Sequence, residues 1–176
     1  MSTKTVISVE EFDRLVEPDE LRYELDEGEL ITLTRPGVVH GRIERRLIVS
    51  LQMYLDTRPI GEVFGSNVLF VLGPSTKRAP DVSVVLRSID PAKEIQGAPE
   101  LAIEILSRSN SSRTMRRKIS PYFAAGCRLV WLVNPETRTV EVWMNPESSA
   151  RVLHESDTLE ASAILPGFAI PVARLF

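Results

Sequence analysis

Cysteines and long apolar runs are scarce in this chain, and each shortage excludes a class of protein. The single cysteine among 176 residues, Cys127, rules out an internal disulfide and a cysteine-based zinc site. Because it adjoins the apolar stretch LVWLV, we expect it in the core. No apolar run approaches the roughly 18 residues of a transmembrane helix. The N-terminal segment MSTKTVISVEEFDRLV has acids where a signal peptide has its apolar core, so we expect a cytoplasmic protein.

A surplus of basic residues is also missing. The 24 acids outnumber the 21 lysines and arginines, and the net charge of −3 argues against strong non-specific binding of nucleic acid. The basic residues nevertheless form two clusters, which are Arg42, Arg45 and Arg46, and Arg113, Arg116, Arg117 and Lys118. Either cluster is compatible with a solvated helix face or with contacts to phosphates.

The chain does contain the apolar residues that a globular core needs, because 43% of it is hydrophobic and 26% is charged. Residues 8–16 predict a short helix with a capping box at its start. Residues 22–33 predict a hairpin with Gly28 at its turn. Residues 41–56 predict a longer helix, since apolar residues recur there every four positions.

The second part of the chain alternates between strand and helix patterns. Short strand-like runs punctuated by glycine and proline begin at Gly61. A second helix is predicted from residue 111 or 112 to Gly126, with Pro121 expected to kink or shorten it. The strand–helix–strand passage from 101 to 133 predicts one parallel crossover. These patterns indicate an α+β fold in a single domain over residues 1–176, with a mixed twisted sheet flanked by helices.

Two of the predicted strands each carry one acid. Asp81 opens the run DVSVV, and Glu104 lies inside the run LAIEILS. An unpaired buried carboxylate costs several kcal/mol, roughly, so a basic side chain, a metal ion or an exposed sheet face must account for each acid. If the two strands are neighbours, the carboxylates repel each other. Mg²⁺ bound by Asp81, Glu104 and the backbone carbonyl of Ile105 would resolve that repulsion.

A lysine follows these acids in the sequence. Lys118 lies about one turn into the helix after the Glu104 strand, from which its ammonium could reach back toward the carboxylates. There it would help to deprotonate a water molecule or offset charge on a pentacovalent phosphorus. A divalent cation at the same place would lower the pKa of the water. A plain surface position for Lys118, within its arginine-rich run, is the alternative.

The order and spacing of these pieces resembles the PD-(D/E)XK nuclease superfamily and, more narrowly, the Uma-type family of restriction-endonuclease-like proteins. The matching pieces are YELDEGEL (23–30), His40 at the opening of a helix, APDV (79–82), EILS (104–107), KISPYFAAGCRLVWLVNP (118–135) and LPGF (165–168). The resemblance runs nearly end to end. It implies a restriction-endonuclease-like core, a divalent metal (Mg²⁺ or Mn²⁺) and hydrolysis of phosphodiester bonds in DNA.

The resemblance also implies roles for individual residues. Asp81 and Glu104 would hold the metal, with the carbonyl of Ile105 beside them, and Lys118 would be the catalytic lysine. Leu106 occupies the position where the superfamily motif usually has that lysine, so the lysine is displaced from the strand to the next helix.

Two further residues match the family pattern. Glu24, within YEL, matches an acid that many members have, which would be a further contact to metal or water. His40 matches a histidine that orients a phosphate or the entry of a helix, and a structural role is the alternative for both residues. The chain departs from the family at Thr114 and Asn134, where relatives usually have acids.

Three hypotheses for the function follow. The first is a Mg²⁺- or Mn²⁺-dependent DNA endonuclease. The second is a catalytically degenerate nucleic-acid-binding or regulatory domain on the same fold, and the third is a structural homo-oligomer whose acids pair with arginines. A homodimer would suit cleavage of both DNA strands. The apolar C-terminal segment PGFAIPVARLF is compatible with such an interface or with the core.

Overall fold

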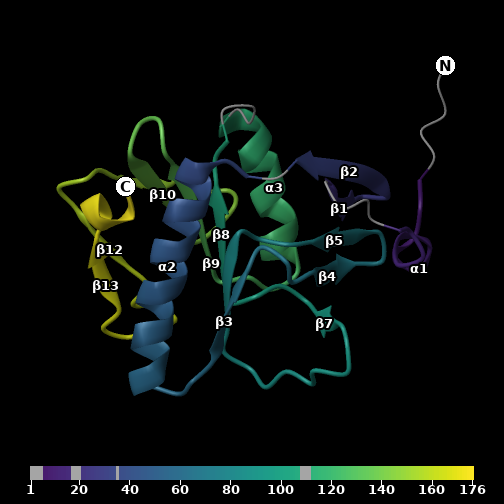
Figure 1. Ribbon diagram of the computed structural model, residues 1–176, viewed down its shortest axis with the longest axis horizontal. Helices are drawn as coiled ribbons and strands as arrows, with labels where there is room; N and C mark the ends of the chain where they lie inside the picture. The colour runs from purple at the N-terminus through teal and green to yellow at the C-terminus, as the bar shows by residue number, and fades with distance from the viewer. Residues whose placement is uncertain (1–5, 17–20, 35, 108–111) are drawn as a thin grey trace.

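The computed structural model of the chain describes residues 6–16, 21–34, 36–107 and 112–176. The helices are α1 (Val9–Phe12), α2 (Val38–Thr57), α3 (Ser112–Ala124) and the 3₁₀ helix η1 (Val172–Leu175). Figure 1 shows α2 and α3 on opposite sides of a sheet, with a second sheet beyond α3. None of the helices described is both long enough and apolar enough to cross a lipid bilayer.

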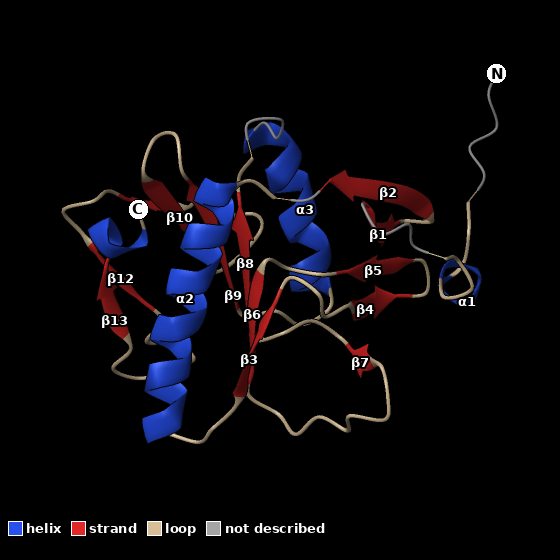
Figure 2. Ribbon diagram, in the orientation of Figure 1, coloured by secondary structure: helices blue, strands red, loops and turns tan. Residues whose placement is uncertain are grey.

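The strands form two larger sheets and a ribbon (Figure 2). The six-stranded sheet has the order β11 (Arg151–Leu153), β10 (Thr139–Trp143), β9 (Leu129–Asn134), β8 (Leu101–Ile105), β6 (Val82–Val85) and β3 (Glu62–Gly65). The five-stranded sheet has the order β2 (Glu29–Thr34), β1 (Leu21–Asp26), β5 (Thr76–Arg78), β4 (Phe70–Gly73) and β7 (Ile95–Gln96). Strands β12 (Thr158–Glu160) and β13 (Ala169–Pro171) form the ribbon. The predicted α+β class with a mixed sheet is confirmed.

The passage β8–α3–β9 is the parallel crossover that the sequence predicts. Leu101 of β8 pairs with Leu129 of β9, and the ladder continues in parallel to Ile105. Because a parallel connection needs a crossover, α3 packs back over the face of these strands. Helix α3 thereby packs against β9, the neighbour of the strand β8 that carries Glu104.

Helix α3 differs from its prediction at Pro121. The helix continues past Pro121 to Ala124, and the N–H of Ala125 still donates to the carbonyl of Pro121 (3.0 Å). Proline removes only its own hydrogen bond, and here its ring meets the space of a pocket. Of the two expected effects of Pro121, a kink or a shorter helix, the shortening does not occur. Gly126, with a φ of +98°, follows the end of the helix as predicted.

Helix α2 covers the other face of the six-stranded sheet. Its predicted apolar stripe is fully buried in one cluster with the sheet, and the helix begins three residues earlier than the periodicity indicates, at Val38. Members of the stripe are Ile43, Leu47, Leu51 and Leu55. Burying each such side chain stabilises the fold by about 1.5–3 kcal/mol.

The predicted hairpin is present as β1–β2, and Gly28 lies in its turn as expected. Glu27 and Gly28 have φ values of +49° and +81°. Positive φ at both turn residues matches the right-handed twist of the strands, and glycine adopts it without strain. The chain also passes close to Gly28, since a Cβ there would lie 2.1 Å from Val6 Cγ1. This hairpin places Glu24, on β1, in the interior.

The C-terminal segment belongs to the core. Phe168, Ile170, Val172 and Leu175 are buried in the same cluster as α2. The ring of Phe168 stacks on Trp131 of β9 with centroids 6.2 Å apart. Of the two interpretations of PGFAIPVARLF, interface or core, the structure supports the core. The expected burial of Cys127 is also confirmed, at 6% exposure.

Candidate active site

Asp81 and Glu104 lie side by side on neighbouring strands. Strands β6 and β8 are antiparallel with Val82 opposite Ile103, so Asp81 comes opposite Glu104 one residue further along. The backbone N–H of Ile105 donates to Asp81 Oδ2 (2.7 Å). The two acids and the peptide of Ile105, all named from the sequence, are therefore brought together at one end of β8.

Lys118 reaches this place from α3. Its Nζ lies 3.3 Å from Glu24 Oε2 and 3.9 Å from Glu104 Oε2. The negative charge of Glu104 raises the pKa of Lys118 above its ordinary value; burial opposes this, while Glu24 adds to it. Lys118 is therefore a protonated ammonium held between two carboxylates.

Glu104 is almost completely buried, at 4% exposure. Its Oε1 accepts a hydrogen bond from the hydroxyl of Tyr122 (2.7 Å). Burial raises the pKa of Glu104 to about 7, the ammonium of Lys118 opposes the rise, and the charges of Asp81 and Glu24 increase it. Negative charge is therefore concentrated around Glu104, and the ammonium of Lys118 compensates it only in part.

Glu24 is held by the strand beside it. The N–H of Ala79 donates to Glu24 Oε1 (3.2 Å), and Arg78 Nη1 lies 4.0 Å from Oε2. Arg78, which is 1% exposed, also pairs through Nη2 with Asp26 Oδ1 (2.6 Å). Sequence reasoning missed Arg78, because the short strand β5 has no apolar alternation. Its place three residues before Asp81 was the only available signal.

His40 lies in the first turn of α2 and contacts Asp81. Its Nε2 is 3.1 Å from Asp81 Oδ2, and its Nδ1 is 3.9 Å from Glu44 Oε2. Burial opposes protonation of His40, but the hydrogen bond and charge of Asp81, with Glu44 and Glu104, outweigh it and raise the pKa. Nδ1 is buried and has no hydrogen-bond partner among the described residues. The structure thus joins Asp81, Glu104, Lys118, Glu24 and His40 in one connected cluster.

The donor set at the end of β8 fits a hard divalent cation. Asp81 and Glu104 lie opposite each other on adjacent strands, and the charge of Asp81 helps to raise the pKa of Glu104. Two carboxylates and a backbone carbonyl are ligands of the kind that Mg²⁺ takes with water. Within the described residues, no three side chains of the His, Cys, Asp and Glu types form a metal-binding group. Backbone or solvent ligands would therefore complete such a site.

The first basic cluster lies on α2, the helix that carries His40. Arg42 and Arg45 are exposed, whereas Arg46 is half-buried. The side chains of Arg113, Arg116 and Arg117 lie outside the described part of the structure. Of the second cluster, only the side chain of Lys118 is therefore described, and it lies between Glu24 and Glu104.

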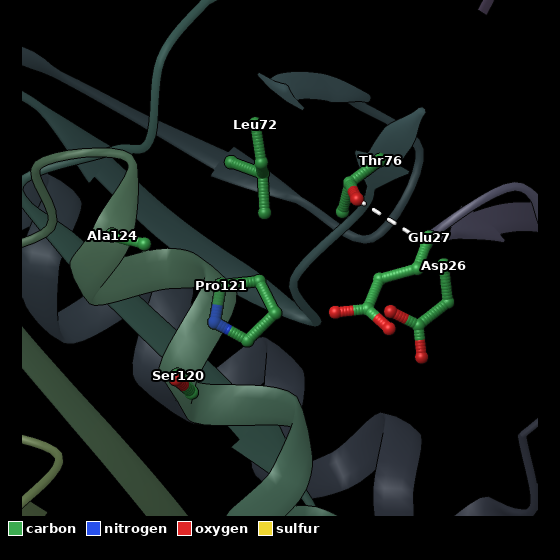
Figure 3. Close-up of a pocket in the computed structure, with 7 residues that line it drawn as sticks. All are labelled: Asp26, Glu27, Leu72, Thr76, Ser120, Pro121 and Ala124. Atoms are coloured by element: carbon green, nitrogen blue, oxygen red, sulfur yellow. Dashed lines mark hydrogen bonds between the residues drawn. The ribbon is translucent and has the colours of Figure 1, made fainter. Parts of the chain in front are cut away.

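A pocket of about 440 Å³ lies between the β1–β2 hairpin and α3. Figure 3 shows the side chains of Asp26 and Glu27 on one side and Pro121 and Ala124 of α3 on the other. Asp81 and Glu104 do not line it. Asp26 lines the pocket and pairs with Arg78, and Arg78 in turn approaches Glu24 of the acidic cluster. The pocket is therefore distinct from the candidate metal ligands.

Comparisons with known proteins identify the fold and the family of the chain. The structure superimposes on the crystal structure of a "putative nuclease belonging to DUF820" from Anabaena variabilis with a TM-score of 0.84, at 23% identity over 97% of both chains. This similarity shows the fold, which is the expected restriction-endonuclease-like one. A search of curated proteins gave no match. The model of the Uma2 family, described as "Putative restriction endonuclease", matches residues 9–173. The chain therefore belongs to the Uma2 family.

Proposed function

We propose that this protein is a Mg²⁺- or Mn²⁺-dependent endonuclease that hydrolyses phosphodiester bonds in DNA. The observation that supports it best is the pairing of Asp81 and Glu104 on adjacent strands, with the Lys118 ammonium 3.9 Å from Glu104. The hypothesis of a structural homo-oligomer instead requires that guanidinium groups pair with these acids. Arg78 does approach Glu24, but no arginine contact to Asp81 or Glu104 occurs among the described residues.

Asp81, Glu104 and the backbone carbonyl of Ile105 would hold the cation. When bound, it would supply Lewis acidity that polarises the phosphodiester and activates water. Its positive charge would also favour the ionised form of Glu104, whose pKa is about 7 without it. The chain's own residues then have to orient the substrate and balance charge.

Lys118 would stabilise negative charge rather than accept a proton. Its raised pKa keeps the ammonium protonated at neutral pH, so it is a poor general base and a good hydrogen-bond donor to a phosphoryl oxygen. Glu24 would position it, since Glu24 Oε2 is the nearer of its two carboxylate contacts. His40 would orient Asp81 through the 3.1 Å contact.

The exposed arginines of α2 support DNA as the substrate class. Arg42 and Arg45 are three residues apart and exposed on α2, the helix that also carries His40, and phosphate contacts from them would offset the net charge of −3. Arg42→Ala and Arg45→Ala should each weaken binding of duplex DNA and reduce the salt slope by about one unit. Fluorescence anisotropy at several salt concentrations measures this slope. An affinity that ignores salt would contradict DNA as the partner.

The experiment that tests the function combines metal binding with cleavage. Wild-type protein should be stabilised by Mn²⁺ in a thermal melt and should nick supercoiled plasmid with Mn²⁺ or Mg²⁺ but not with EDTA. Asp81→Asn should lose both effects. Asp90→Asn, at an exposed acid paired with Lys93, is the matched control and should retain both. A wild type that cleaves equally well in EDTA would refute the metal-dependent mechanism.

The degenerate-domain hypothesis rests on a specific residue. Leu106 stands where the superfamily usually has its lysine, and it is 8% exposed beside Tyr122 in the α3 cluster. If the wild type binds Mn²⁺ and DNA but never cleaves, this hypothesis replaces the first. A homodimer with two such sites would convert nicks into double-strand breaks, and sedimentation with the cleavage assay tests that state.

A further inference from the structure

Two buried acids in the site are held in the same way. Each has one carboxylate oxygen bound to a fixed donor: Glu24 Oε1 accepts from the N–H of Ala79 (3.2 Å), and Glu104 Oε1 accepts from the hydroxyl of Tyr122 (2.7 Å). The other oxygen of each acid faces Lys118. The orientation of both carboxylates is therefore set from the side away from the ammonium.

The two fixed donors differ in kind. The Ala79 amide belongs to the backbone, and no substitution except proline removes it. The Tyr122 hydroxyl is a side chain on α3, four residues after Lys118 and hence on the same face of the helix. Tyr122 is 0% exposed, and its ring packs with Leu106 and Ile119. One buried side chain thus controls how the carboxylate of Glu104 is turned.

We propose that Tyr122 is a positioning residue for metal binding: its hydroxyl occupies Glu104 Oε1 and leaves Oε2 as the oxygen that a divalent cation can take. This inference rests on the proposed function only for the presence of the cation. The 2.7 Å hydrogen bond has the Tyr122 hydroxyl as its donor, so Oε1 of Glu104 is already occupied. Groups that hydrogen-bond a metal ligand in this way tune affinity for the ion.

A plain structural role makes a different prediction. If Tyr122 only satisfies a buried acid, removing its hydroxyl lowers the stability of the protein and leaves the intrinsic affinity for metal unchanged. If Tyr122 positions Glu104, the affinity of the folded protein for the metal falls, which a loss of stability alone would not cause. Metal affinity measured on the folded protein separates the two.

The experiment uses Tyr122→Phe, which keeps the buried ring, and Tyr54→Phe as the matched control. Tyr54 is also buried and donates its hydroxyl to the carbonyl of Pro166 (2.8 Å), on the α2 side of the sheet. Isothermal titration of metal-free protein with Mn²⁺ gives the Kd, and circular dichroism in EDTA confirms that each variant is folded. We expect the Kd of Tyr122→Phe to rise about 10–100-fold and that of Tyr54→Phe to stay at the wild-type value.

Activity gives a second readout. At Mn²⁺ concentrations that saturate the variant, the nicking rate of Tyr122→Phe should return to within a few-fold of wild type, since the hydroxyl acts through Glu104. An unchanged Kd in Tyr122→Phe overturns the inference, whatever the nicking rate. A wild type that binds Mn²⁺ without cleaving DNA overturns the nuclease function alone, whereas a wild type that binds no Mn²⁺ overturns both.

Discussion

The two faces of β8 are built from alternate residues of one strand and have opposite characters. Leu101, Ile103 and Ile105 pack in the α2 cluster, which is wholly apolar. Ala102 faces α3, and Glu104 meets Lys118 and Tyr122 of that helix. All five residues are nearly inaccessible to water. Burial alone therefore does not indicate the role of a residue in β8. The role depends on the side chains of the helix that packs against it.

The two faces of β8 contribute differently to the stability of the fold. The α2 face gains stability mainly from apolar burial, and its charged pair, His40 and Asp81, lies only at the end of β8. The α3 face instead holds ionised groups away from water, and a buried ion pair often stabilises no more than apolar residues of the same size would. Buried charge clusters of this kind are concentrated at functional sites. The comparison predicts that substitutions on the apolar face change mainly stability, whereas substitutions on the α3 face change the proposed metal binding and cleavage.

The largest effect is expected from Lys118 on the α3 face. Lys118→Met should reduce plasmid nicking in Mn²⁺ by about 10²–10⁴-fold, because the ammonium that balances phosphoryl charge is lost. Stabilisation by Mn²⁺ in a thermal melt should persist, since the carboxylates remain. Lys93→Met, at a lysine that is 78% exposed, is the matched control and should cleave normally.

Leu106 offers a way to sharpen this test. It packs beside Tyr122 and lies two residues beyond Glu104, so the α3 face includes it. Adding Leu106→Lys to Lys118→Met places an ammonium at the superfamily's usual position and should restore part of the activity. If Lys118→Met alone cleaves as fast as wild type, the role assigned to Lys118 is wrong.

On the α2 face, a substitution should lower stability and leave metal binding intact. Leu51 is 0% exposed, and Leu51→Ala should lower the free energy of unfolding by about 2–5 kcal/mol. Met53→Ala, on the same helix but 66% exposed, should change it by about 0.5 kcal/mol or less. Urea unfolding with and without Mn²⁺ measures the free energy of unfolding and the increment that Mn²⁺ adds to it. A loss of the Mn²⁺ increment in Leu51→Ala would break the division between the faces.

A smaller effect is expected from pH, through Glu104. Its pKa is about 7 in the folded protein, against 4.5 ordinarily, so the folded state binds the extra proton between these values. Its contribution to stability is complete below pH 4.5 and is lost as the pH rises through 7. Metal-free protein should therefore lose up to roughly 3 kcal/mol across this window, and His40, with its raised pKa, acts in the same direction above pH 6.5.

Urea unfolding in EDTA at several pH values measures this loss. Glu104→Gln should remove most of the pH dependence, because the amide does not titrate, whereas Glu160→Gln at an exposed strand position should retain it. Saturating Mn²⁺ should flatten the profile of the wild type, since the cation favours the ionised carboxylate. A metal-free wild type that grows more stable from pH 5 to 7 would contradict the assigned burial of Glu104.

Much of the fold could be predicted because its signals are local. The capping box of Ser8 and Glu11 is present, although α1 ends at Phe12, before the predicted limit. The four-residue apolar period of α2 and the Gly28 turn both correspond to structure. Strand β5 was missed because three polar residues, Thr76 to Arg78, carry no apolar alternation and are buried only by their neighbours.

For the candidate site, the sequence determined which groups are present and which strands carry them. The order Asp81, Glu104, Lys118 and the apolar Leu106 are properties of the chain itself, and they favour metal-assisted chemistry before any contact is known. The tertiary structure alone decided that Tyr122 and Arg78 join them. The reason is physical: a hydroxyl 2.7 Å from Glu104 and a guanidinium between Glu24 and Asp26 result from packing α3 and β5 against β8 and β1. No local pattern records such long-range packing.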